Sequence, residues 1–150
     1  MIQVDYLSQE VADHRYALRY RNFIFEAMTV LKASEMLNLK KTPTIWLGFI
    51  EKVNAKFKWG IFYPETNLIL IDPRRRSYDR ILYTLIHECT HSDQYNRGWF
   101  KGGKWMGKVS MTEAVMNLTD VKEYRELPWE ADVRDRMGPI YYYMAKEMGV

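Results

Sequence analysis

The segment LIHECTHSDQY, residues 85–95, constrains the fold more than any other part of this 150-residue chain. It contains two of the chain's three histidines, His87 and His91, with Glu88 directly after the first. Residues four apart lie on the same face of an α-helix, so a helix here would direct both imidazoles toward one point. Glu88 is rotated by about 100° from His87 around the helix axis and would flank that point.

Two imidazoles at this spacing form half of a zinc site, and the His-Glu-x-x-His pattern is typical of zinc peptidases. In that chemistry the glutamate takes a proton from a zinc-activated water. The pattern therefore predicts metal ligands at His87 and His91 and a general base at Glu88. The alternative is that both histidines belong to an ordinary polar surface. Cys89 lies on the predicted buried stripe of the same helix, which favours a core thiol over a ligand.

Composition predicts a single domain over residues 1–150 with a sizeable core, because 47% of the residues are hydrophobic and 15% are aromatic. A net charge of +3 does not by itself indicate nucleic-acid binding. One cysteine excludes an internal disulfide and fits a reducing compartment. The first residues lack a signal-peptide pattern, and no apolar run is long enough to span a bilayer, so we expect a cytoplasmic protein without membrane contact.

Periodicity and turn signals place the expected elements along the chain. Helices are predicted over residues 9–37, 77–95, 110–125 and 128–144. Strands are predicted over residues 43–50, 57–63 and 67–72, with the last two forming a hairpin. The glycine-rich segment 98–108 is predicted to be a loop, whose Trp99, Phe100 and Trp105 either cover a cleft or pack into the core. The predicted class is α+β.

A catalytic zinc needs a third protein ligand and an open position for water. Glu130 in LPWEADVRD is the preferred candidate, because a carboxylate in the first turn of the last helix is well tolerated there. Asp132 points to another side of that helix and is the alternative. His14, expected on a helix surface, and Asp93 are further candidates.

With these residues, the segment 43–137 resembles the minimal zincin core in its gluzincin-like form, as in small bacterial, phage-type and ImmA/IrrE-like metallopeptidases. The resemblance implies an N-terminal helix, a three-stranded mainly antiparallel sheet, an active-site helix with His87, Glu88 and His91, and a C-terminal helix whose Glu130 completes a zinc site. Unlike SprT-like proteins, the chain has no third histidine downstream of the motif, and it lacks the extended histidine motif of metzincins. Arg134 stands where a thermolysin-type pattern would have an aspartate.

The resemblance also implies a polypeptide substrate in extended form along an edge strand, here the run FKWGIFY, with Gly60 allowing close backbone approach. The alternative is an ordinary hairpin strand. Gln94 and Tyr95 follow the motif on the ligand side of the helix, which suits either of them to hydrogen-bond an oxyanion. The alternative is that they only satisfy backbone groups.

A rival function is a binding or structural module of the same fold without peptidase activity. The basic run at residues 74–76 is read as a solvated face, with nucleic-acid contact as a minority alternative. The sequence predicts no oligomeric state.

Overall fold

The helix that carries His87 and His91 is the element against which the others pack. This helix, α3 (Tyr78–Asn96), begins after Ser77 and has Asp79 in its first turn, where a negative charge is favourable. Its fully buried apolar residues face the core; they are Ile81, Leu82, Leu85, Ile86 and Cys89. The computed structural model describes residues 1–51, 58–74, 76–101, 104–107 and 127–150.

The remaining elements lie on both sides of α3 in the chain. The strands are β1 (Val4–Tyr6), β2 (Thr44–Leu47), β3 (Gly60–Tyr63), β4 (Leu68–Ile71), β5 (Phe100–Lys101) and β6 (Lys104–Trp105). The other helices are α1 (Gln9–Ala12), α2 (Ala17–Ser34) and α5 (Pro128–Met148). In chain order, β1, α1, α2, β2, β3 and β4 precede α3, and β5, β6 and α5 follow it. The predicted α+β class is therefore confirmed.

The predicted three-stranded, mainly antiparallel sheet is wrong. The main sheet has four strands in the order β1-β2-β4-β3, and both β1–β2 and β2–β4 are parallel. Only the predicted hairpin, β3–β4, is antiparallel, and this prediction is confirmed. The sequence LILI of β4 explains its central place, because a continuous apolar run suits a strand covered on both faces. Strand β1 has only three residues, too few for an alternating pattern to reveal it.

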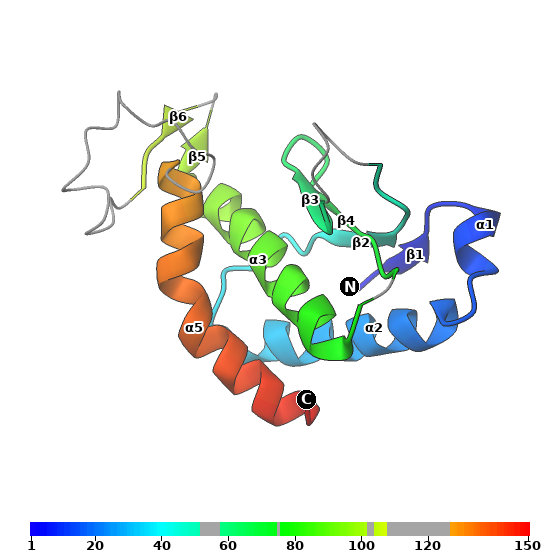
Figure 1. The fold of residues 1–150 in the computed structure, drawn as a ribbon. Coiled ribbons are helices and arrows are strands. Elements are labelled where there is room, and N and C mark those ends of the chain that lie inside the picture. The colour runs from blue at the N-terminus through cyan, green and yellow to red at the C-terminus, as the bar shows by residue number, and fades with distance from the viewer. Residues whose placement is uncertain (52–57, 75, 102–103, 108–126) are drawn as a thin grey trace.

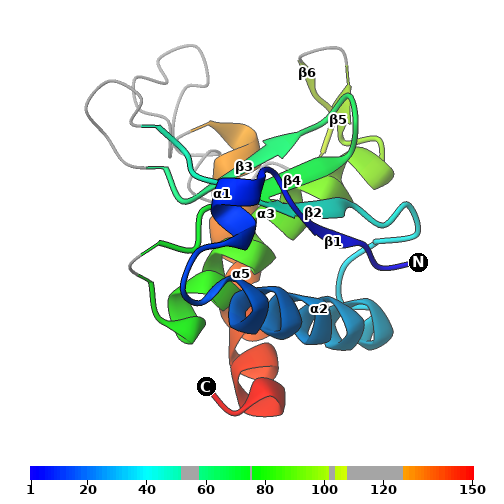
Figure 2. The same ribbon diagram turned by 90° about the vertical axis from the view of Figure 1, so that its right-hand side faces the viewer.

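One face of this sheet packs against helices. The register aligns Val4, Ile45 and Ile69 in one row across the parallel strands, and all three are buried. Helix α2 contacts β1, and α3 contacts β3 and β4, while α5 packs along α3 (Figure 1). In the view turned by 90°, α2 runs below the strands (Figure 2). The core therefore lies between the sheet and the helix pair α2–α3, and α3 separates the sheet from α5.

Several predicted boundaries change in the structure. The helix expected over 9–37 is interrupted at residues 13–16, between α1 and α2. The expected loop at 98–108 contains the short antiparallel pair β5–β6. The last helix begins at Pro128 as predicted and ends before Gly149, which has a left-handed backbone conformation. The helix predicted at 110–125 lies outside the described residues.

The described helices include no candidate membrane span. Across the residues that the structure describes, no helix combines the length and apolar character that crossing a bilayer requires.

The packing of α3 generates a stability prediction. Leu85 is completely buried, so Leu85→Ala should lower the free energy of unfolding by about 2–5 kcal/mol through lost apolar burial and a residual cavity. Leu18 on α2 is 65% exposed, and Leu18→Ala should change it by less than about 0.5 kcal/mol. Urea unfolding followed by circular dichroism measures both. Similar losses in the two variants would contradict the assigned packing face of α3.

Candidate metal centre

Two helices bring three potential metal donors to one place. His87 and His91 project from α3, and Glu130 projects from the first turn of α5. The Nε2 atoms of His87 and His91 lie 3.1 and 2.9 Å from the two carboxylate oxygens of Glu130. One donor atom from each residue falls within 4.8 Å of the others. The three residues are therefore close enough to bind one metal ion, as the sequence predicted.

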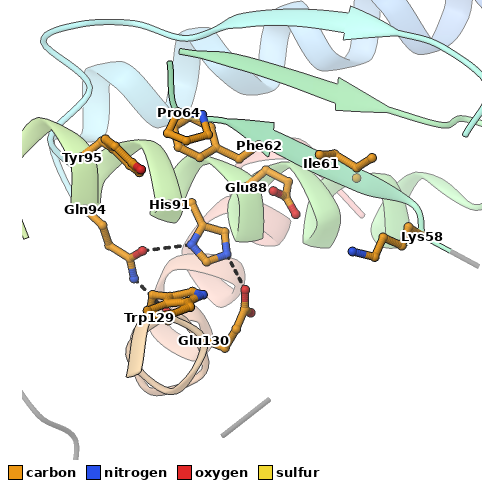
Figure 3. Close-up of a pocket in the computed structure, with 11 residues that line it drawn as sticks. Lys58, Ile61, Phe62, Pro64, Glu88, His91, Gln94, Tyr95, Trp129 and Glu130 are labelled. Atoms are coloured by element: carbon orange, nitrogen blue, oxygen red, sulfur yellow. Dashed lines mark hydrogen bonds and ion pairs between the residues drawn. The ribbon is translucent and has the colours of Figure 1, made fainter. Parts of the chain in front are cut away.

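The orientation of the His91 ring is set by its other nitrogen. Nδ1 lies 2.9 Å from Oε1 of Gln94, which accepts a hydrogen bond if Nδ1 carries the proton. The Gln94 amide cannot turn freely, because its nitrogen donates to the Trp129 carbonyl at 2.8 Å and to Asp132 Oδ2 at 2.9 Å. Gln94 thus favours the tautomer of His91 whose Nε2 lone pair is directed toward the donor cluster. Figure 3 shows His91 between Gln94 and Glu130.

The other carboxylates considered from sequence have different partners. Asp132 accepts a hydrogen bond from Gln94 and another from Nη2 of Arg136, which lies 2.8 Å from Asp132 Oδ2. It does not belong to the donor cluster. Asp93 is fully buried and forms ion pairs with Arg97 at 2.9 Å and Arg136 at 2.8 Å. Both carboxylates therefore brace α3 against its surroundings instead of joining the two histidines.

Glu88 is a buried carboxylate beside the donor cluster. Burial raises its pKa above the ordinary value, opposed by the charges of His91 and His87. For His91, burial favours the neutral ring, but the hydrogen bond and charge of Glu130 outweigh it and raise the pKa. Glu88 and His91 line a cavity of about 270 Å³ between β3 and α5. The site thus combines donors, an acid–base group and open space.

Gly60 fixes how closely β3 approaches α3. A Cβ atom at this position would lie 2.6 Å from Cγ2 of Thr84 and 3.0 Å from Cγ of Glu88. The absence of a side chain therefore serves the contact between strand and helix, in addition to any approach of a substrate backbone. Two residues on, Phe62 stacks on the His91 ring with centroids 6.4 Å apart. Strand β3 therefore forms one wall of the site.

No protein-family model, curated protein or solved structure matches this chain. The function therefore has to be inferred from the geometry of this site.

Other residues singled out from the sequence lie away from the donors. His14 is in the turn between α1 and α2, next to the Phe49 ring, and not on a helix surface. Cys89 is buried against Met28 as expected, and burial raises the pKa of its thiol. Trp99 packs edge-to-face on Trp105.

Arg74 and Arg76, the described residues of the basic run at 74–76, have different surroundings. Arg74 pairs with Asp72 at 2.7 Å, Arg75 lies outside the described residues, and Arg76 lines a second cavity.

Sequence reasoning missed the positioning role of Gln94 and Asp132. The sequence suggests Gln94 as an oxyanion donor, yet its amide nitrogen donates to the Trp129 carbonyl and to Asp132. The signal present in the sequence is Gln94's position three residues after His91, which places both on one helix face. Its link to Asp132 depends on the docking of α5, which the sequence does not reveal.

The donor geometry predicts unequal roles for the two α5 carboxylates. Glu130→Ala should weaken zinc binding by more than the 10- to 100-fold typical of an outer hydrogen-bond partner, whereas Asp132→Ala should stay within about that range. Competition with a chromophoric chelator measures both affinities. A larger loss in Asp132→Ala would mean that α5 docks in another register.

The Gln94 contact predicts a separate effect on affinity. Gln94→Leu should weaken zinc binding by about 10- to 100-fold because the His91 ring loses the partner that fixes its tautomer. Asn96→Leu is the matched control, since it also removes an amide from α3 but one that bonds to the Asn38 and Lys41 carbonyls. Equal losses in both variants would show a general effect of helix stability.

Proposed function

We propose that this protein is a zinc-dependent metallopeptidase of the zincin type that hydrolyses peptide bonds in extended polypeptides. The observation that supports it best is the convergence of His87, His91 and Glu130 next to a cavity that His91, Glu130 and the buried Glu88 line. In this proposal the first three residues bind the metal, and Glu88 performs proton transfer.

The donor set fits zinc. Two imidazole nitrogens and one carboxylate oxygen form one of the ligand sets of catalytic zinc sites, which leave a fourth position open. The Gln94 contact supports this assignment, since a ligating imidazole usually donates its other N–H to a neighbouring acceptor. Bound zinc would supply a Lewis acid that polarises the scissile carbonyl and lowers the pKa of water.

Glu88 is the residue proposed to move the proton. Its carboxylate takes a proton from the attacking water and then delivers it to the departing amine nitrogen. Burial, which raises its pKa, makes it a stronger base than an exposed glutamate. In Figure 3 its carboxylate points into the cavity rather than toward Glu130. It is therefore available to water and substrate.

The substrate is proposed to lie along β3. This strand is at the edge of the sheet, as the sequence predicted. The carbonyl of Trp59 accepts a hydrogen bond from Asp72 N, so residue 59 faces β4. Because successive residues of an antiparallel strand alternate, the backbone groups of Gly60 and Phe62 turn away from β4. An extended chain could add to this edge by main-chain hydrogen bonds.

The open cavity favours catalysis over a structural metal. Structural zinc sites are closed by four protein ligands, whereas three donors next to a space of about 270 Å³ leave room for water and substrate. A binding module without activity would not need a buried carboxylate beside the donors.

Glu88→Gln tests the chemistry. The substitution keeps size and shape but removes the base, so hydrolysis of a loosely structured protein such as casein should fall by about 10²- to 10⁴-fold. Zinc content, measured by elemental analysis, should stay near that of the wild type because Glu88 is not a ligand.

A chelator-treated wild type serves as the control for metal dependence. Equal hydrolysis by wild type and Glu88→Gln would exclude Glu88 as the base. Zinc-loaded, folded wild type that cleaves no polypeptide would favour the binding-module alternative.

A further inference from the structure

A second cavity lies beside His87 and Glu88 and adjoins the first cavity. It measures about 250 Å³ and lies between the start of β3 and the first half of α3. Lys58, Gly60 and Glu88 line both cavities, whereas Arg76 and His87 line only the second one. This volume is below the roughly 300–1,000 Å³ of sites for drug-sized ligands. It suits one side chain or one chain end of a substrate.

Arg76 is held rigidly in the wall of this second cavity. Its Nη1 donates to the Thr84 hydroxyl at 2.7 Å, and its Nη2 donates to the Arg80 carbonyl at 3.3 Å. The guanidinium lies over the Trp59 ring, 4.8 Å from its centroid. These contacts use two of its five N–H groups and pre-organise the planar fork, which matches the geometry of a carboxylate.

Basic side chains outnumber acidic ones in the lining of this cavity, which favours an anionic ligand. Lys58 and Arg76 line it on one side, and Glu88 is its one acidic lining residue among those described. Across the described ranges, Arg76 forms no ion pair with a carboxylate. Burial and the neighbouring Arg80 lower the pKa of Arg76, opposed by the charges of Asp72 and Asp79, neither of which forms an ion pair with it. A partly buried cation of this kind gains most from an incoming anion.

We propose that this second cavity is a carboxylate-binding subsite, in which Arg76 selects substrates with an acidic group next to the cleaved bond. This inference rests on the proposed peptidase function, because that function makes the ligand a polypeptide. The carboxylate comes either from an Asp or Glu side chain or from a free C-terminus, since both present the same group to Arg76.

The strand direction says which side of the bond carries the acid. From Gly60, β3 runs away from Lys58 and Arg76 toward Pro64 and Tyr95. Antiparallel pairing is the more stable arrangement. A substrate paired in this way has its C-terminal part at Arg76. The acidic residue therefore follows the cleaved bond.

The first experiment profiles cleavage sites. Wild type is incubated with a pool of peptides from a digested, denatured protein, and new termini are read by mass spectrometry. Asp and Glu should be enriched about tenfold after the cleaved bond, the scale of one charge-assisted hydrogen bond. Arg76→Gln should abolish this enrichment. Arg80→Gln is the matched control, because it removes a neighbouring positive charge that does not line the cavity.

The second experiment measures binding without hydrolysis. Fluorescein-labelled peptides that differ only by Glu, Gln or Lys at one position are titrated into Glu88→Gln, followed by anisotropy. A further pair differs by a free or amidated C-terminus. The Glu peptide should bind about tenfold more tightly than the Gln peptide, and adding Arg76→Gln should remove the difference. A preference limited to the free C-terminus would identify the chain end as the source of the carboxylate.

The outcomes separate this inference from the proposed function. Absence of cleavage with an Arg76-dependent binding preference refutes the peptidase and supports the subsite. Cleavage without acidic enrichment, or binding that ignores the Glu-to-Gln change, overturns the subsite. Lys58→Gln gives a second test if Arg76→Gln does not fold, because Lys58 lines the same cavity without contributing to the Arg76 hydrogen bonds. It should lower the acidic preference at least about threefold, and an unchanged preference overturns the proposal.

Discussion

The docking of α5 on α3 through buried polar contacts is the interaction on which the site depends. Glu130 reaches both histidines of α3, and one turn away Gln94 links His91 to Asp132. Arg136 of α5 also pairs with the fully buried Asp93 of α3. Buried polar groups are costly unless they are satisfied, so these contacts tolerate little displacement of one helix along the other. The geometry of the donors therefore follows from the register of two helices that are distant in sequence.

The local parts of the fold could be predicted because their signals are local. The four-residue spacing of His87 and His91 specified both a helix and a common face, and Pro128 marked the start of α5. The hairpin of β3 and β4 could be predicted from two β-rich runs joined by turn residues. The pairing of β2 with β4 could not be predicted, because it depends on which strand buries both of its faces once the chain has folded. Strand β1 can be recognised only in the structure, where it pairs with β2.

The residues of the site also fall into a group that the sequence predicts and a group that only the structure reveals. Helical periodicity placed His87, Glu88 and His91, and first-turn chemistry favoured Glu130 over Asp132. The outer contacts required three-dimensional information, since Gln94 has a clear role only when Trp129 and Asp132 lie beside it. Arg76 is similar: in the sequence it ends a run of three arginines, whereas in the fold it stacks on Trp59 and contacts Thr84. Charge runs conceal such differences because neighbours in sequence face different surroundings.

The position of Cys89 shields it from thiol redox chemistry. It is the chain's single cysteine, fully buried beside Met28 and adjacent in sequence to Glu88. Thiol oxidation and disulfide exchange proceed through an accessible thiolate, and burial disfavours both accessibility and ionisation here. Oxidants therefore meet no reactive thiol while α3 remains packed. The chain's single thiol is protected by the same helix that carries the histidines.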